Sequence, residues 1–160
     1  MERKRFYNNS ITVENNIVTK STSVKIDVDA VKLLMKENLD YVPKIISVND
    51  NEIKYQYVEG IAVGTHLKKS KSLHEIMEVQ SFVSKCWLDF HNISLRELKN
   101  KKYFYYQDFH LWNMVYSKNK FMLTDIDSFT ITNKPKLNTT HSYLYSQLED
   151  IICCTNSSQV

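Results

Sequence analysis

Three polar residues in the second half of the chain constrain its fold most strongly. Asp108 stands five residues before Asn113, between a predicted long helix and a predicted β-hairpin. The hairpin ends in Leu123-Thr124-Asp125-Ile126-Asp127, where an apolar strand returns carboxylates toward the first two residues. Phosphoryl transfer from ATP needs one carboxylate that accepts the proton of a hydroxyl group, and an amide and a second carboxylate that hold Mg²⁺. The pattern therefore predicts a phosphotransfer site.

The hydrophobic pattern around this segment predicts an α+β domain, with a small β-rich first half and a more helical second half. We expect strands at 5–7, 11–20, 44–48 and 53–58, with a hairpin turn at Glu14-Asn15-Asn16. Helices are expected at 23–38, 73–93 and 141–153, a second hairpin at 114–117 and 120–124, and a loop at 129–140. The helical periodicity predicts that Val24, Val28, Val31 and Met35 form the buried face of the first helix, and Ile76, Val79, Val83, Trp87 and Phe90 that of the second.

Composition excludes several classes of protein. The 160 residues include only two glycines and two prolines, which argues against a glycine-rich phosphate loop. The net charge of +3 is too small to predict a nucleic-acid partner. Cys86, Cys153 and Cys154 are too few and too poorly spaced for a disulfide framework or a zinc site. No apolar run reaches the length of a transmembrane segment, so we expect a cytoplasmic protein.

The segment around Asp108 resembles the catalytic loop of the protein-kinase-like superfamily. The resemblance is closest to aminoglycoside phosphotransferases, choline kinases and lipopolysaccharide core kinases, in which this loop reads His-Gly-Asp-x-His-x-x-Asn. Here it reads Tyr106-Gln-Asp-Phe-His-Leu-Trp-Asn113, and Thr124-Asp125-Ile126 resembles the later Ile-Asp-Phe motif. The resemblance implies that Asp108 is the catalytic base and that Asn113 and Asp125 bind Mg²⁺. Asp127 remains an alternative to Asp125.

Two further segments resemble the nucleotide-binding parts of this superfamily. Tyr55-Gln-Tyr-Val-Glu-Gly60 resembles the hinge, which implies that the backbone of Tyr57, Val58 and Glu59 holds adenine. Ile17-Val-Thr-Lys20 resembles the strand that presents the ATP-binding lysine.

The carboxylate partner of that lysine is expected on the following helix. Asp29 falls in the matching position, and Asp27 is the neighbouring alternative. Lys25 competes with Lys20 for the role of the lysine itself. Asn8-Asn9-Ser10 stands where the superfamily has its glycine-rich loop.

The resemblance implies one minimal, bilobal kinase-like domain over residues 1–160. Its β-rich N-lobe would cover about 1–59 and its hinge about 57–62, followed by a reduced helical C-lobe at about 63–154 and a polar tail at 155–160. The implied activity is ATP- and Mg²⁺-dependent transfer of the γ-phosphoryl group to a hydroxyl of a glycan, another small molecule or a protein Ser/Thr. The alternatives are an inactive pseudokinase that binds nucleotide or regulates a partner, and nucleotidylation with ATP bound in reverse.

Overall fold

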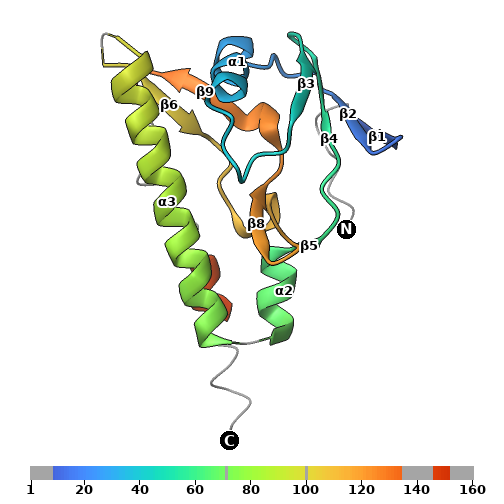
Figure 1. Cartoon of the computed structure of the whole chain (residues 1–160), viewed down its shortest axis with the longest axis vertical. Helices are drawn as coiled ribbons and strands as arrows, with labels where there is room; N and C mark the ends of the chain where they lie inside the picture. Colours follow the sequence, from blue (N-terminus) through green and yellow to red (C-terminus); the bar gives the residue numbers. More distant parts are fainter. Residues whose placement is uncertain (1–8, 71, 100, 135–145, 152–160) are drawn as a thin grey trace, which may run out of the picture.

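A computed structural model describes residues 9–70, 72–99, 101–134 and 146–151, and this part of the chain is a mixed α+β structure (Figure 1). The strands are β1 (Ser10–Glu14), β2 (Ile17–Ser21), β3 (Ile45–Val48), β4 (Glu52–Gln56), β5 (Ile61–Ala62), β6 (Tyr103–Tyr106), β7 (Met114–Ser117), β8 (Lys120–Leu123) and β9 (Phe129–Thr132). The helices are α1 (Val28–Glu37), α2 (Val63–Ser70), α3 (Leu73–Glu97) and the 3-10 turns η1 (Leu111–Asn113) and η2 (Ile126–Ser128). Residues 146–151 are also helical.

The strands form three antiparallel sheets. The largest has the order β1-β2-β4-β3, the second β5-β7-β8, and the third pairs β6 with β9. The predicted hairpin between β1 and β2 is confirmed, and Asn15 and Asn16 form its turn with φ of 49° and 64°. Asparagine tolerates this left-handed conformation better than most residues, which is why it is favoured in two-residue hairpin turns. The expected strand at 5–7 lies outside the described residues.

The first helix is shorter than predicted. Asp27 ends the preceding loop by accepting a hydrogen bond from Ala30 N at 3.1 Å, so the helix begins at Val28 rather than near residue 23. The buried face of α1 is Ala30, Val31 and Leu34. Of the four predicted core positions only Val31 is buried: Val28 is half-buried, and Val24 and Met35 are 51% and 41% exposed. Val24 precedes the cap, and contacts of α1 with β3 and β9 decide which face of the helix turns inward.

Residues 129–132 form strand β9 instead of the predicted loop. They pair in antiparallel register with β6, with Phe129 opposite Tyr106 and Ile131 opposite Phe104. The Phe129 ring stacks on Tyr106 at 4.5 Å and on Phe104 at 5.2 Å between centroids. Pairing of this kind depends on a partner strand distant in sequence, which the local Asn- and Thr-rich composition does not reveal.

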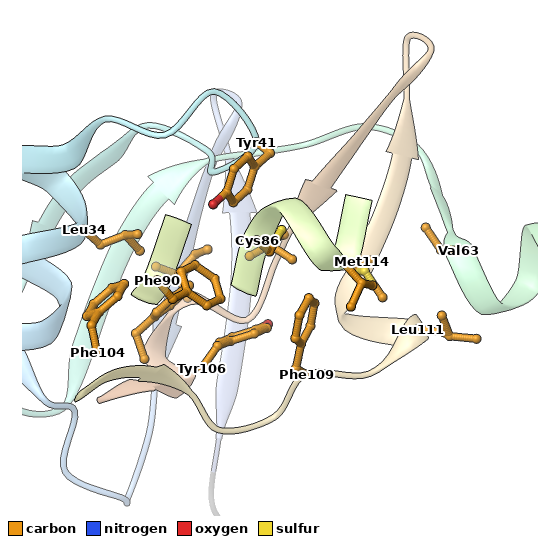
Figure 2. Close-up of a cluster of buried hydrophobic side chains, with 14 of the residues drawn as sticks. Leu34, Tyr41, Val63, Cys86, Phe90, Phe104, Tyr106, Phe109, Leu111 and Met114 are labelled. Carbon is orange, nitrogen blue, oxygen red and sulfur yellow. The ribbon is translucent and has the colours of Figure 1, made fainter. Parts of the chain in front are cut away.

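Helix α3 provides the longest wall of the core. It begins at the Ser72 cap, and Ile76, Val79, Val83 and Phe90 are buried as predicted, whereas Trp87 is half-buried against the core. Figure 2 shows the buried cluster, which runs from Leu34 on α1 through the aromatic rings near α3 to Val63 and Leu111. Full burial of a residue such as Phe90 contributes about 1.5–3 kcal/mol.

Two more helical segments differ from the predicted pattern. The predicted last helix is described only at 146–151, and α2 lies where no element was expected. Among the described helices, none has both the length and the apolar composition needed to cross a bilayer. The division into two lobes and a tail stays a prediction.

Candidate functional site

Hydrogen bonds hold the segment after β6 against the segment after β8. The buried Tyr106 donates its hydroxyl to Thr124 O at 2.5 Å, and Thr124 donates through N and Oγ1 to Asn113 O at 2.9 and 3.1 Å. Gln107 N donates to Ser128 O at 3.0 Å. These bonds place the loop that carries Asp108 and Asn113 beside the residue that follows Thr124. The predicted convergence of the two segments is therefore present in the fold.

Lys20 lies at the centre of the charged cluster. Its side chain projects from β2, is 6% exposed, and forms ion pairs with Asp125 and, at 2.8 Å, with Asp127. Lys25, the competing lysine, pairs instead with Asp50 and has a side chain that is 76% exposed. The geometry thus joins Lys20, rather than Lys25, to the acidic end of the β7–β8 hairpin.

The predicted partner of Lys20 is wrong. Asp29 is exposed in the first turn of α1, and no described contact joins it to Lys20. Asp27 also serves elsewhere, because its Oδ2 accepts hydrogen bonds from Thr130 Oγ1 at 2.9 Å and Ile131 N at 2.8 Å. Because α1 begins at Val28, Asp27 caps the helix and also links it to β9. Lys20 pairs instead with Asp125 and Asp127, more than one hundred residues later in the chain.

Burial and charge act against each other in this cluster. Burial lowers the pKa of Lys20, but the two carboxylates outweigh it, so the pKa of Lys20 lies above its ordinary value. Burial and the adjacent charge of Asp125 raise the pKa of Asp127, although the Lys20 ammonium opposes that rise. The Lys20 ammonium therefore favours the ionised state of the two neighbouring carboxylates.

The backbone of Asp125 is in a left-handed conformation that residues other than glycine seldom adopt. Its φ of 55° and ψ of 47° are left-handed, at the entrance to η2. The Oδ2 atom accepts a hydrogen bond from Ser128 Oγ at 2.9 Å, and Oδ1 faces Lys20. Aspartate tolerates this region better than bulky residues, and such conformations are common where a side chain must be aimed at a site.

Asp108 is held in place by its neighbours in the loop. Asn113 Nδ2 donates to Asp108 O at 2.9 Å and to Asp108 Oδ2 at 3.1 Å. His110 Nε2 lies 3.4 Å from Asp108 Oδ1, and His110 Nδ1 accepts a hydrogen bond from Trp112 N at 3.2 Å. These contacts fit the tautomer with the proton on Nε2. The hydrogen bond from His110, ahead of that from Asn113, lowers the pKa of Asp108 against the opposing effect of burial.

The residues present fit a magnesium ion that is completed by substrate. Because Asn113 donates through Nδ2, its amide oxygen remains an acceptor, and the carboxylate of Asp125 lies in the adjoining segment. Mg²⁺ is usually held by one or two protein oxygens together with phosphates and water. No cluster of three or more His, Cys, Asp or Glu side chains suited to a metal occurs in the described part of the chain. Magnesium binding by Asn113 and Asp125 stays a prediction.

The predicted hinge lies apart from the charged cluster. Tyr57, Val58 and Glu59 line a cavity of about 410 Å³, together with residues of the β7–β8 hairpin. Lys20 and Asp125 line a different hollow, of about 250 Å³. Tyr57 N already donates to Asn16 O at 2.9 Å, so a nucleotide base would have to use other backbone groups of this segment. Adenine binding by the hinge stays a prediction.

Two apolar residues beside Lys20 were not predicted as part of the site. Ile11 pairs with Lys20 and Val13 with Val18, so all four side chains lie on one face of the sheet. Lys20 and Val18 are buried, but Ile11 and Val13 are 60% and 51% exposed. They form an apolar surface next to the buried lysine. The alternation of Ile11, Thr12 and Val13 is the sequence signal that identifies this face.

Comparisons with known proteins leave the family open. No protein-family model matches the chain, and no curated protein matches it. Among solved structures, it is similar to a chain in the ternary complex of streptomycin and ATP with APH(2″)-IIa, with 14% sequence identity and a TM-score of 0.36. The match covers 77% of this chain and 64% of that one, so this chain spans less than two thirds of the length of its match. A likeness at this TM-score assigns neither a family nor a function.

Proposed function

We propose that the protein is an ATP- and Mg²⁺-dependent phosphotransferase that moves the γ-phosphoryl group of ATP to a hydroxyl group. One observation carries the proposal. Lys20 on β2 is bonded to Asp125, and the residue before Asp125 is bonded to Asn113, which in turn holds Asp108. A buried cation, a metal-competent amide and carboxylate, and a separate ionised carboxylate are thus adjacent, and phosphoryl transfer uses these groups.

The nucleotide would bind along the face of β1 and β2 that carries Ile11, Val13 and Lys20. Ile11 and Val13 offer an exposed apolar face for the base, and the backbone of the hinge residues offers polar contacts to its edge. Lys20 would exchange a carboxylate partner for phosphate oxygens of ATP. Magnesium held by Asn113 and Asp125 would neutralise phosphate charge.

Asp108 would act on the acceptor. It orients the hydroxyl and takes its proton while the hydroxyl oxygen forms a bond to the γ-phosphorus and the bond from that phosphorus to ADP breaks. The Asp108 carboxylate is ionised at neutral pH like any aspartate, and its lowered pKa extends this to more acidic conditions, while His110 fixes its direction. About half of the Asp108 side chain, 56%, is exposed, so a glycan, another small molecule or a protein Ser/Thr can approach it.

One observation favours a nucleotide-binding pseudokinase as the second candidate. Asp125 and Asp127 both have Lys20 as a cationic partner. The protein itself therefore neutralises part of the charge of the pair, and the fold does not depend on a metal ion for that part. In that case Lys20 and the two aspartates would stabilise the structure and bind nucleotide without turnover.

The test measures binding and transfer separately. Purified protein is titrated with ATP in the presence and absence of Mg²⁺, and is then incubated with γ-labelled or α-labelled ATP and a pool of hydroxyl acceptors. We expect Mg²⁺-dependent binding and transfer of the γ-label, both lost in Asp125→Asn and retained in the control Lys25→Met. Binding without transfer would favour the pseudokinase. Transfer of the α-label would indicate nucleotidylation, and unchanged Mg·ATP affinity in Asp125→Asn would contradict the metal assignment.

A further inference from the structure

Trp112 is a large aromatic residue left open to solvent in the middle of the candidate catalytic loop. It lies in η1, its neighbour Leu111 is fully buried, and Trp112 itself is 40% exposed. Exposed tryptophans with one rigid apolar face are typical of binding surfaces, because the indole presents a large contact area at a low cost in conformational entropy.

Helix α2 supports the ring from one side. A Cβ atom added to Gly64 would lie 2.8–3.0 Å from three carbons of the Trp112 ring, so the indole packs directly on the glycine backbone. Lys68, one helical turn later, places Nζ 5.0 Å from the ring centroid. Residues four apart share one face of a helix, so both contacts reach the ring from α2. The exposed part of the ring therefore faces away from that helix.

The ring is also connected to the proposed catalytic base through His110. The His110 and Trp112 rings lie 6.4 Å apart between centroids, and His110 contacts Asp108 through its other side. The hydrogen bond from Trp112 N to His110 Nδ1 fixes the relative position of the two residues. The exposed indole and the Asp108 carboxylate are thus linked through one intervening side chain, that of His110.

From these contacts we propose that Trp112 is the acceptor platform of the site, and that the acceptor is a sugar ring that carries an acidic group. This inference rests on the proposed phosphotransferase function. A pyranose has an apolar face of C–H groups that packs on an aromatic ring and hydroxyls around its edge that reach Asp108. The Lys68 ammonium, 5.0 Å from the ring centroid, gives the surface around the indole a positive potential, which favours an acidic substituent over a cationic one without a direct contact.

The test uses the indole N–H signals of the two tryptophans in ¹⁵N–¹H NMR spectra of the full chain. Trp112→Phe assigns them. The probes are methyl β-D-glucuronide, methyl β-D-glucoside and glucosamine. We expect the glucuronide to shift the Trp112 signal and leave that of Trp87 unchanged, the glucoside to bind more weakly, and glucosamine to have no effect. Lys68→Glu should weaken glucuronide binding about tenfold.

Three variants separate a binding role from a structural one, and their affinity for the glucuronide is measured by isothermal titration calorimetry because the Trp112 variants lack the indole reporter. Trp112→Phe should retain part of the affinity, since it keeps an aromatic face, and Trp112→Leu should abolish it. Tyr103→Leu is the matched control, because Tyr103 is 37% exposed and lies at the far end of β6 from the loop. Circular dichroism checks that each variant is folded. An equal loss of glucuronide affinity in Trp112→Leu and Tyr103→Leu would contradict the proposal. So would a Trp112 signal that none of the three sugars shifts.

Failure of the platform and failure of the proposed function give different results. If Mg·ATP binds and the Trp112 signal ignores every sugar, the platform is wrong and the phosphotransferase proposal stands. If the glucuronide shifts Trp112 but ATP binds neither with nor without Mg²⁺, the sugar site stands and the phosphotransferase proposal is wrong. With a transferred label, Trp112→Leu should raise KM for the sugar and leave the affinity for ATP unchanged.

Discussion

The ammonium group of Lys20 is bonded to the carboxylate of Asp125, a residue 105 positions later in the chain. The bond joins β2 of the largest sheet to the turn that follows the β7–β8 hairpin. Asp127 accepts a second bond from the same nitrogen at 2.8 Å. One buried lysine thus connects two parts of the fold and is shared by two carboxylates.

Replacing this lysine should affect both stability and nucleotide binding. Lys20→Met leaves Asp125 and Asp127 without their cation, and loss of one member of a buried ion pair costs about 3–5 kcal/mol. Lys25→Met, at an exposed ion pair, should change the free energy of unfolding by less than about 1 kcal/mol. Urea denaturation measures both values, and similar small changes in the two variants would contradict a central role for Lys20.

The pH dependence of stability should reveal the raised pKa of Asp127. In a group whose pKa is higher in the folded state, the favourable contribution is complete below the unfolded pKa and is lost as pH rises through the folded pKa. Asp127→Asn cannot ionise, so its stability relative to wild type should increase on going from about pH 3.5 to pH 7. Denaturation of both proteins across this range is the measurement. A constant difference would show that burial does not perturb Asp127.

Gly64 should be essential for the position of Trp112. Glycine to alanine in a helix normally stabilises by about 1 kcal/mol, but here the new methyl group meets the indole at less than ordinary contact distance. Gly64→Ala should therefore destabilise the protein by about 1–3 kcal/mol. In the background Trp112→Leu the same substitution should become neutral or stabilising. A double-mutant cycle that gives no coupling would contradict the packing of the ring on Gly64.

Ser94 should contribute to stability through two buried hydrogen bonds of its hydroxyl group. Its buried Oγ donates to Phe90 O at 2.7 Å and accepts from Phe104 N at 2.8 Å, which joins α3 to β6. Ser94→Ala leaves the Phe104 N–H unpaired and should cost about 1–3 kcal/mol. Ser84 is the matched control on the same helix, since its exposed Oγ makes only the corresponding bond to Gln80 O among the described contacts. Ser84→Ala should change stability by less than about 0.5 kcal/mol.

The contact between His110 and Asp108 should set the acid limb of any phosphotransfer activity. The His110 hydrogen bond lowers the pKa of Asp108, so the carboxylate remains ionised at a lower pH than an unpaired aspartate. His110→Leu removes this bond, and the pKa of Asp108 should rise. The acid limb of kcat/KM should then move to higher pH, and ¹³C NMR titration of the carboxyl group provides a readout independent of turnover. An unchanged titration would contradict the role of His110.

Local patterns in the sequence were enough for the elements that depend on neighbours in the chain. Asn15-Asn16 specified a tight hairpin turn, and the apolar spacing from Ile76 to Phe90 specified the buried face of α3. The spacing of Asp108, Asn113 and Asp125 around a hairpin brought their segments together, because an antiparallel hairpin returns the chain to its starting point.

Only the tertiary structure decided the long-range relationships. The choice of Asp125 and Asp127 over Asp29 as partners of Lys20 depends on how α1 and the turn after β8 are placed relative to β2, and no local signal encodes that placement. The pairing of β9 with β6 and the packing of Trp112 on Gly64 are equally nonlocal. Turn propensity and helical periodicity act between residues near in sequence, whereas burial and ion pairing act between residues near in space, and the latter determined the partners within this site.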